Sequence, residues 1–357
     1  MSINYNEDER SALEAISEAQ RIAFSPFIFQ ATVAMRDLGL LADIEMAGDI
    51  GINAEALADK ANLSVYGVKV LLDAGLSFGL VWKNEENYCL GKVGHYILND
   101  KMTIANLEFT RDLCYRGLDS LKDSIREGKP SGLKEFGGGD TIYPKLSALP
   151  EPAKSSWFNF DHYYSDIAFP DVLPLVFKYN PKHLLDVGGN TGKWAMQCVK
   201  YNEDINVTVV DLPQQLALMR ENIVQHGLSD RIDGYAIDWL SDDGDLPTNA
   251  DAVWMSQFLD CFSEAQIKKI LGRIVKAMKP GARLHIMETF WDRQEFEVAA
   301  FSLNCISLYF TCFANGNSRM YHSDDMKKLI IESGFEIERE VDGIGISHTL
   351  LTCKLSK

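Results

Sequence analysis

The sequence predicts an α/β protein, in which a doubly wound, mostly parallel, Rossmann-like sheet follows a mainly helical, winged-helix-like domain. Two observations support this prediction. Before residue 110, apolar residues recur at helical spacing, and a helix, a turn, a second helix and a hairpin pattern follow one another. From residue 182 onward, short apolar runs alternate with helical segments, as in proteins with parallel sheets. We therefore expect three parts, at 1–110, 111–180 and 181–357.

The first part is predicted to consist mainly of helices. Apolar side chains recur at helical spacing, including Ile28 and Met35, and Asn53 and Ser64 are expected to cap two later helices. Two short strands joined by a polar turn should follow at 79–90.

This order of elements is that of a winged-helix unit, so DNA binding has to be weighed. A recognition helix needs side chains that reach base edges and phosphates. The candidate helix from Ser64 to Leu76 offers only Lys69, and Asp73 opposes it. We therefore expect this domain to serve packing or dimerisation rather than DNA binding.

The composition narrows the partners further. The formal net charge is −16, from 51 acidic and 35 basic residues, with no run of Lys and Arg. Such a field repels phosphate backbones and anionic lipid, so we expect neither nucleic acid nor a membrane as partner. No apolar stretch approaches the roughly 18–20 residues that span a bilayer, and the acidic N-terminus has no signal core.

The seven cysteines are scattered, and no Cys-x-x-Cys or zinc-like spacing is present. We expect free thiols, no metal and a cytoplasmic location.

The part between 111 and 180 is expected to be a helical connection that contributes to the pocket. Its second half contains a predicted helix crowded with aromatic residues, among them Trp157, Phe160 and Tyr164, that leads into the last part.

The last part contains seven candidate strands. They are His183–Val187, Asn206–Val210, Ile232–Ile237, Ala252–Met255, Arg283–Met287, Phe335–Val341 and His348–Leu355. Helical stretches at 193–201, 213–227, 263–278 and 323–333 separate most of them. This alternation predicts a mostly parallel sheet with helices on both faces, and the last two strands can form an antiparallel pair at its edge.

The loop after the first strand, Asp186-Val-Gly-Gly-Asn-Thr-Gly192, is rich in glycine. Ligands of such sheets bind at the carboxyl ends of the strands, and glycines let the backbone approach them closely. A Walker A loop is excluded, because the glycines stand too close and Trp194 replaces the hydroxyl that binds Mg²⁺. The dinucleotide fingerprint Gly-x-Gly-x-x-Gly has no match at 188–195. The remaining acid-x-Gly-x-x-x-Gly pattern suits an amino-acid-bearing nucleoside such as S-adenosylmethionine.

Two further strand ends support a nucleoside. Asp211 ends the second strand, where a carboxylate can accept hydrogen bonds from both ribose hydroxyls. The alternative is that Asp211 only caps the helix that begins at Pro213. At the third strand end, Asp238 can bind the adenine amino group while the indole of Trp239 stacks on the ring.

With these motifs the chain resembles, over nearly its whole length, the homodimeric small-molecule O-methyltransferases of the plant caffeic-acid type and their bacterial relatives. The matching motifs are Asp186-Val-Gly-Gly-Asn-Thr-Gly192, Val210-Asp211-Leu212-Pro213, Asp238-Trp239, Phe258-Leu-Asp-Cys-Phe-Ser-Glu264, Met278-Lys-Pro-Gly281 and Ser333-Gly-Phe335. The resemblance implies a homodimer and S-adenosylmethionine as the cofactor. The cofactor residues that it implies are Gly188 at the methionine end, Asp211 and Leu212 at the ribose, and Asp238 and Trp239 at the adenine. Ser256 matches a cofactor position that is usually Lys or Arg.

The chain departs from this family at the catalytic base. The family's Val-Leu-His-Asp-Trp-Ser stretch aligns with Phe258–Ser263, so Asp260 stands at the position of the histidine. Of the family's two assisting carboxylates, one matches Glu288 and the other falls on Ser318. The catalytic residues implied are therefore Asp260 and Glu288.

This departure has an energetic consequence. Proton transfer from a phenol of pKa ~10 to an ordinary aspartate of pKa ~3.9 is uphill by roughly 8 kcal/mol, against about 5 kcal/mol for a histidine. Asp260 can act as the base only if burial or the charge of Glu288 raises its pKa, or if the substrate hydroxyl is more acidic.

Three hypotheses follow. Asp260 can be a tuned base, it can merely orient an acidic phenol or enol, or the site can have lost methyl transfer. His162 and His322 are alternative bases, although a single histidine is more often a surface or core residue.

The acceptor pocket is expected to draw on residues after Glu288, namely Phe301, Asn304, Tyr309 and Met320, although an aromatic stripe can also be plain core. The sequence thus predicts an S-adenosylmethionine-dependent O-methyltransferase acting, without metal, on a hydroxylated aromatic or polyene-type small molecule. The alternative is a catalytically silent cofactor-binding or regulatory protein with a winged-helix dimer domain.

Overall fold

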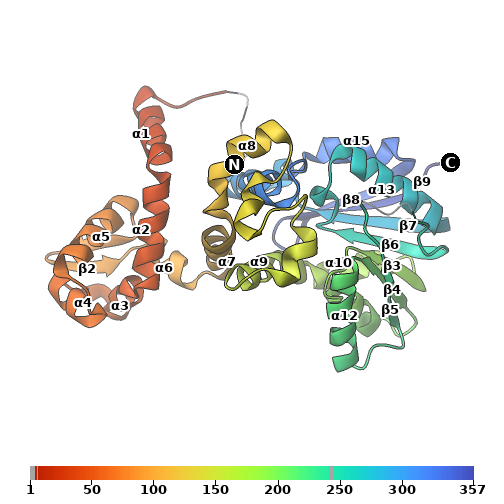
Figure 1. Cartoon of the computed structure of the whole chain (residues 1–357), viewed down its shortest axis with the longest axis horizontal. Coiled ribbons are helices and arrows are strands. Elements are labelled where there is room, and N and C mark those ends of the chain that lie inside the picture. The colour runs from red at the N-terminus through yellow and green to blue at the C-terminus, as the bar shows by residue number, and fades with distance from the viewer. Residues whose placement is uncertain (1–4, 6, 241–243) are drawn as a thin grey trace. The chain divides into compact units, whose positions relative to one another are not determined.

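The computed structural model describes residues 5, 7–240 and 244–357. Its internal contacts divide the chain into two compact units, one that ends at Arg111 and one that begins at Asp112. The predicted connection at 111–180 therefore belongs to the same unit as the sheet (Figure 1).

The N-terminal unit consists of helices and one hairpin. Its elements are α1 (Ala12–Ala23), α2 (Ser25–Asp37), α3 (Leu40–Met46), η1 (Gly48–Ile50), α4 (Ala54–Ala61), α5 (Val65–Phe78), β1 (Val81–Asn84), β2 (Asn87–Leu90), α6 (Lys92–Asn99) and α7 (Lys101–Phe109). Asn53 accepts the N–H of Ala56 at 2.8 Å and Ser64 that of Gly67 at 3.1 Å, so both predicted N-caps are confirmed. The strands β1 and β2 pair antiparallel, as expected for 79–90.

Helix α1 differs from the other helices of this unit, because none of its residues is buried. Its apolar side chains Leu13, Ile16 and Ile22 are 75%, 61% and 66% exposed. By contrast, Leu57 and Leu72, on α4 and α5, are fully buried in the core of the unit.

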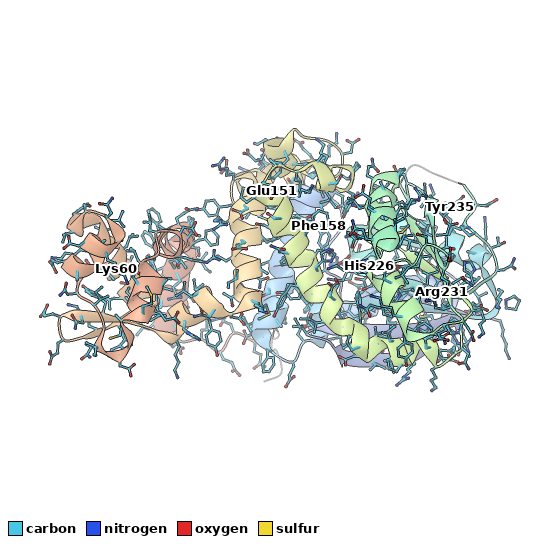
Figure 2. The ribbon with its side chains drawn as sticks, turned by 90° about the horizontal axis from the view of Figure 1, so that it is seen from below. Lys60, Glu151, Phe158, His226, Arg231 and Tyr235 are labelled. Carbon is cyan, nitrogen blue, oxygen red and sulfur yellow. The ribbon has the colours of Figure 1, made fainter. Side chains whose placement is uncertain are left out.

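The segment before the sheet is helical throughout much of its length. Its elements are η2 (Thr110–Cys114), η3 (Gly117–Ser120), α8 (Leu121–Glu127), η4 (Ser131–Phe136), η5 (Tyr143–Ala148), α9 (Ala153–Ser165), η6 (Asp166–Ala168) and α10 (Phe169–Phe177). In Figure 2, Glu151 marks the chain just before α9 and Phe158 lies within this helix.

The sheet has the predicted doubly wound, mostly parallel form. Its strands are β3 (His183–Val187), β4 (Asn206–Asp211), β5 (Ile232–Ala236), β6 (Ala250–Ser256), β7 (Met278–Glu288), β8 (Phe335–Ile344) and β9 (His348–Leu355). They lie in the order β5-β4-β3-β6-β7-β9-β8, and all neighbours are parallel except β9, which runs antiparallel to β7 and β8. The predicted antiparallel pair at the sheet edge is therefore confirmed.

Helices cover both faces of this sheet, which explains why its strands read as continuous apolar runs. On one face, α13 (Glu264–Ala277) and α15 (Ser323–Glu332) pack in a core that contains Leu185. On the other face, α10, α11 (Lys193–Tyr201) and α12 (Pro213–Gln225) pack in a core that contains Leu184 (Figure 1). Neighbouring residues of one strand thus serve opposite cores.

The strand order reverses at β3, because β4 lies on one side of it and β6 on the other. Ligands of doubly wound sheets bind in the crevice at such a switch point, outside the carboxyl ends of the strands. The glycine loop that follows β3 lies at this place.

The expectation that no apolar stretch approaches the length needed to span a bilayer is wrong. Helix α14 (Glu297–Tyr309) continues into η9 (Phe310–Ala314), and the 18-residue run from Glu297 to Ala314 is apolar and long enough to cross a membrane. Phe310 and Phe313 are buried within the folded unit, and core helices of folded domains pass the same length test. The absence of a membrane partner stays a prediction.

Candidate functional site

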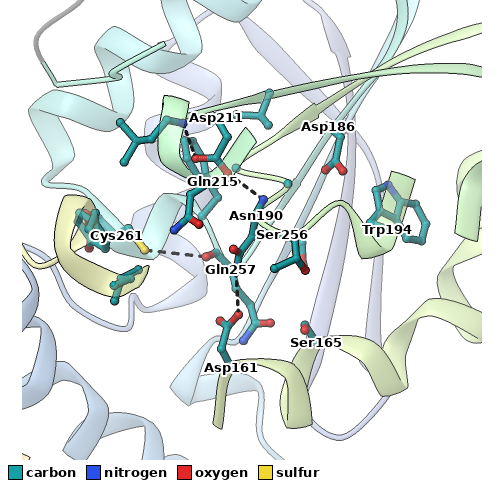
Figure 3. Close-up of a pocket in the computed structure, with 18 of the residues that line it drawn as sticks. Asp161, Ser165, Asp186, Asn190, Trp194, Asp211, Gln215, Ser256, Gln257 and Cys261 are labelled. Carbon is teal, nitrogen blue, oxygen red and sulfur yellow. Dashed lines mark hydrogen bonds between the residues drawn. The ribbon is translucent and has the colours of Figure 1, made fainter. Parts of the chain in front are cut away.

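A cavity lies at the carboxyl ends of the strands β3, β4 and β6. Residues of the glycine loop, such as Asn190, line it together with Asp211 after β4 and Ser256 at the end of β6. Asp161 and Ser165 of α9 face them from the opposite side (Figure 3).

The fold brings together every residue that the sequence analysis assigned to the cofactor. Those that line this one cavity are Gly188, Asp211, Leu212, Asp238, Trp239 and Ser256. Parallel strands explain the convergence, because their carboxyl ends meet at the same edge of the sheet.

Gly188 is required by the shape of the loop. Its φ of +72° lies in the left-handed region, and an added Cβ would stand 2.4 Å from Cδ2 of Phe258. Its N–H donates to the carbonyl of Val210 at 3.0 Å, which ties the loop to β4. Any side chain at this position would therefore move Phe258 or close the cavity.

Asp211 is held by backbone groups and faces the cavity. Its Oδ2 accepts the N–H of Asn190 at 2.8 Å, and its Oδ1 accepts that of Leu212 at 2.6 Å. Burial raises the pKa of this carboxyl to about 6. No side chain caps helix α12, which lies wholly in the described part of the chain, so the alternative that Asp211 only caps this helix is not supported.

Asp238 and Trp239 form the third strand-end pair. Asp238 Oδ1 accepts the N–H of Leu240 at 2.9 Å, and the Trp239 ring meets Phe258 edge to face at 5.7 Å. The guanidinium of Arg273 lies 5.0 Å from the centre of the indole.

Several buried polar atoms of the cavity wall have no partner among the residues that the structure describes. They are Oδ2 of Asp186, Oδ1 of Asn190, Oγ1 of Thr191, Nε1 of Trp194, Oε1 of Gln215, Nε1 of Trp239, Oγ of Ser256 and Oε1 of Gln257. A buried polar atom left unpaired costs about 1–3 kcal/mol, so this wall is built for a polar ligand.

The charges of the wall also suit S-adenosylmethionine, which carries a sulfonium and an ammonium group. The acidic, basic and histidine side chains that line the cavity are Asp161, His162, Asp166, Asp186, Lys193, Asp211 and Asp238. Burial, followed by the charge of Asp211, raises the pKa of Asp186 to about 8. The residues present therefore fit a cationic nucleoside with ribose hydroxyls.

The sequence analysis expected residues 111–180 to contribute to the pocket but did not single out Asp161, Ser165 and Asp166 of its α9 wall. Trp157, Asp161 and Ser165 line it at a spacing of four residues, as do His162 and Asp166 beside them. The available signal was this spacing of polar side chains within an aromatic helix, since residues four apart share one helix face.

His162 lies in the cavity wall and His322 does not. Nδ1 of His162 is 3.6 Å from Oδ1 of Asp166, whose Oδ2 pairs with Nζ of Lys193 at 2.6 Å. His322 caps α15, where its Nδ1 accepts the N–H of Asp324 at 3.1 Å.

Asp260 sits in the short turn η7 (Leu259–Cys261) after β6, and it is 5% exposed. Its chain neighbour Cys261 lines the cavity, as do Phe258 and Phe262, whereas Asp260 itself is buried beside this wall and is not among the lining residues. Burial is the largest of the effects that raise the pKa of Asp260 to about 7, and the charge of Asp161 adds to it. Its Oδ1 has no partner among the described residues.

Glu288 ends β7 and holds the turn that carries Asp260. Its Oε1 accepts the N–H groups of Phe258 at 3.0 Å and Leu259 at 2.8 Å. Burial and the charge of Asp260 raise the pKa of Glu288 well above its usual value. Glu288 is 1% exposed and does not line the cavity.

Ser318 supports the same turn from the other side. Its hydroxyl donates to Oδ1 of Asn315 at 3.0 Å, and Nδ2 of Asn315 donates to the carbonyl of Cys261. Tyr143 also donates to that carbonyl, at 3.2 Å.

The residues predicted for the acceptor pocket do not line this cavity. Phe301 is 64% exposed and Asn304 is exposed, both on α14. Tyr309 and Met320 are buried, and the hydroxyl of Tyr309 accepts the indole N–H of Trp157, a cavity residue, at 2.9 Å. The sequence placed all four after Glu288, but the helix α14 turns half of them away from the strand ends.

Among residues 5, 7–240 and 244–357, no group of three His, Cys, Asp or Glu side chains is placed to hold a metal ion.

A protein-family model matches each of the two units of this chain. A family model described as an O-methyltransferase domain matches residues 119–336, and a Dimerisation2-like domain model matches residues 17–88. The chain is 23% identical to an L-tyrosine C(3)-methyltransferase of Streptomyces lavendulae, over 89% of this chain and 86% of that protein. It is 33% identical to a 3-hydroxy-5-methyl-1-naphthoate 3-O-methyltransferase of Streptomyces sahachiroi, over 35% of this chain and 36% of that protein. The apo structure of the S-adenosylmethionine-dependent methyltransferase SibL has the same fold, with a TM-score of 0.73 and 23% identity over 96% of this chain and 100% of that one.

Proposed function

We propose that this chain, which belongs to the O-methyltransferase family because that family model covers more than half of its length, methylates a hydroxyl group of an aromatic small molecule. Membership confirms the predicted family, and S-adenosylmethionine as its cofactor. Family membership does not determine whether the methyl group is transferred to oxygen, carbon or nitrogen. Transfer to oxygen is therefore the proposal.

The observation that carries this proposal is the convergence of the strand-end residues on one cavity with unpartnered polar atoms. The bound cofactor supplies a methyl group on a positively charged sulfur. Asp211 is placed to accept hydrogen bonds from ribose hydroxyls, because a carboxylate has lone pairs left after two backbone bonds. Asp238 and Trp239 are placed at the end of the cavity where an adenine would lie.

Asp260 is the proposed base. With a pKa raised to about 7, about half of the Asp260 carboxyls are ionised at neutral pH. Accepting a proton from a phenol of pKa ~10 then costs roughly 4 kcal/mol instead of roughly 8. Burial thus gives this carboxylate a basicity close to that of the histidine that it replaces in the family.

Glu288 is proposed as a positioning residue rather than a second base. It accepts two backbone N–H groups of the turn that carries Asp260, and burial and the charge of Asp260 raise its pKa. Tyr143 and Asn315 hold the next carbonyl of the turn, so Asp260 has little freedom to move.

A flat aromatic acceptor suits the part of the cavity that the strand ends do not occupy. Tyr143, Pro144, Leu146, Trp157 and Phe262 line that part. One similar protein is named as methylating a naphthoate hydroxyl and another as methylating a ring carbon of tyrosine, and both acceptors are phenols. Methylation at oxygen is favoured here because the proposed base can take a hydroxyl proton.

The test is transfer of a labelled methyl group from S-adenosylmethionine to a panel of phenols, followed by nuclear magnetic resonance of the product. An O-methyl product supports the proposal, whereas a methyl group on ring carbon or nitrogen contradicts it. The single-turnover rate should rise with pH through about 7 as Asp260 ionises.

Substitution of Asp260 separates the hypotheses about its role. Asp260→Ala should lower the single-turnover rate by about 10²-fold or more if Asp260 is the base. A loss of less than about tenfold would leave it only an orienting role. The exposed Asp123→Asn on α8 is the matched control. If the wild type binds the cofactor but methylates no phenol, the catalytically silent alternative replaces this proposal.

We also propose a homodimer formed through the N-terminal unit. The Dimerisation2-like match begins at residue 17, within α1, and the apolar side chains of α1 are exposed within the chain, including Leu13 and Ile16 just before the match. Exposed apolar surface of this kind is typical of an interface. The double substitution Leu13→Glu with Ile16→Glu should yield a monomer in sedimentation equilibrium, whereas Val224→Glu, at an exposed apolar site on α12, should not.

A reducing compartment, with the cytoplasm as the simplest one, is proposed from the thiols. All seven cysteines lie in the described part of the chain and are free, and Cys305 is exposed. Cell fractionation that finds the protein in an oxidising compartment would contradict this.

A further inference from the structure

Asp161 is one of the charged residues of the cavity that neither the strand ends nor the proposed base accounts for. It lies on α9, opposite the strand ends, and it lines the cavity (Figure 3). Burial is the largest effect on its carboxyl and raises its pKa. Removal of a carboxyl from water raises its pKa because burial disfavours the charged form.

The groups around Asp161 carry charges of both signs. Its neighbour His162 and Lys193, which begins α11, lower its pKa, whereas the charge of Asp166 raises it. The Lys193 ammonium also pairs with Asp166, at 2.6 Å. At the cavity, Nδ2 of Asn190 donates to Oδ2 of Asp161 at 3.4 Å.

Asn190 also locates Asp161 along the ligand. The same residue donates its backbone N–H to the ribose carboxylate Asp211 at 2.8 Å, so Asp161 lies one asparagine side chain away from the ribose position. On its other side, Asp161 is close enough to Asp260 for its charge to act on that carboxyl. Asp161 therefore contacts Asn190, which also binds the ribose carboxylate, and its charge acts on the proposed base.

Asn190 makes these two contacts from a left-handed backbone conformation. Its φ of +50° lies in a region that asparagine adopts more readily than most residues other than glycine. Its Oδ1 is buried and has no partner in the described part of the chain. The side-chain amide of Asn190 thus donates through Nδ2 to Asp161, while its Oδ1 is left as an acceptor beside that contact.

We propose that Asp161 is a further cofactor-binding residue, whose carboxylate faces the positively charged methionyl part of S-adenosylmethionine. The sulfonium is bonded to the ribose 5′ carbon, and its methyl group has to reach the acceptor held near Asp260. The sulfonium must therefore lie between the ribose carboxylate Asp211 and the proposed base Asp260, and Asp161 is the α9 carboxyl that lines the cavity opposite the strand ends. This inference rests on the proposed function, because it takes S-adenosylmethionine as the ligand.

The test compares a charged and a neutral nucleoside. 5′-Methylthioadenosine keeps the ribose and adenine but lacks both positive charges, and S-adenosylmethionine has them. Asp161→Asn should weaken binding of S-adenosylmethionine by about tenfold or more and that of methylthioadenosine by less than about twofold in titration calorimetry. Asp123→Asn, on the surface, should change neither affinity.

The neutral nucleoside also reports whether the variant is folded. If Asp161→Asn weakens both ligands equally, Asp161 shapes the pocket and the inference is wrong. Unchanged binding of S-adenosylmethionine would equally overturn it. Should the Asn variant not fold, Asp161→Glu, which keeps the charge, must retain the preference for the charged ligand. Wild-type protein that binds neither ligand would instead overturn the proposed cofactor site itself.

Discussion

Oε1 of Glu288, at the end of β7, accepts the backbone N–H of Leu259 at 2.8 Å and so fixes the turn that contains Asp260. The two residues are far apart in the sequence, and the neighbouring N–H of Phe258 shares the same oxygen. Because all of these groups are buried, the interaction has consequences for stability as well as for the proposed base.

The first prediction separates hydrogen bonding by Glu288 from its charge. Glu288→Gln keeps an oxygen that can accept both N–H groups, so the free energy of unfolding should change by less than about 1 kcal/mol. Glu288→Leu leaves both buried N–H groups unpaired and should cost about 2–4 kcal/mol. Urea unfolding of the two variants measures the difference, and equal losses would show that the charge matters instead.

The second prediction concerns the pH dependence of stability. The pKa of Asp260 is about 7 in the folded protein, against 3.8 for an unperturbed aspartate. Between these two pH values the folded protein keeps a proton on Asp260 that the unfolded chain has lost. Stability therefore falls as the pH rises from 3.8 to about 7, the full penalty is present above pH 7, and it disappears below pH 3.8. Asp260→Asn removes the penalty.

We therefore expect Asp260→Asn to be more stable than the wild type at pH 8, by about 2 kcal/mol or more, and nearly equal at pH 4. Thermal unfolding of the ligand-free proteins at both pH values checks this. The buried His285 and His348, whose pKa values are lowered to about 3 and about 4, are present in both proteins and cancel in the difference. An advantage at pH 4 that equals the one at pH 8 would contradict the prediction.

The third prediction tests the shape of the glycine loop. Gly188→Ala places a Cβ 2.4 Å from the Phe258 ring at a φ of +72°, and should abolish cofactor binding while lowering the melting temperature. Gly281 is a matched control, because its φ is +86° but nothing lies within 4 Å of an added Cβ. Gly281→Ala should therefore lower stability by about 1 kcal/mol and leave the affinity unchanged.

The fourth prediction concerns the ribose carboxylate. Asp211→Asn removes the charge and one of the two acceptors for Asn190 and Leu212, so the affinity for S-adenosylmethionine should fall by about 10–100-fold. Methylthioadenosine, which has the same ribose hydroxyls, should be weakened equally. This pattern is the opposite of the one expected for Asp161, so the two variants check each other.

Much of the fold follows from local patterns. Strands β3 and β9 have the predicted bounds, and the remaining strands begin or end within a few residues of them, because continuous apolar runs mark strands that are buried on both faces. The caps Asn53 and Ser64 were predictable for a similar reason, since a capping side chain bonds to a backbone group two or three residues away.

The acceptor side was less predictable. The position of Phe301, exposed on α14, depends on which face of that helix packs inward, and a helix that is apolar on several sides does not specify this in its sequence. The polar face of α9 was overlooked because it becomes a cavity wall only where the helix lies against the strand ends.

The sequence by itself determined the sheet, the order of its strand ends and therefore the residues Gly188, Asp211 and Asp238 that converge on one cavity. This is so because parallel strands bring their carboxyl ends together whatever else surrounds them. Only the tertiary structure decided that Asp260 is a carboxyl of pKa about 7 and that Asp161 stands beside it. The basicity of a carboxylate is set by burial and by charges from distant segments, and no local pattern of residues contains that information.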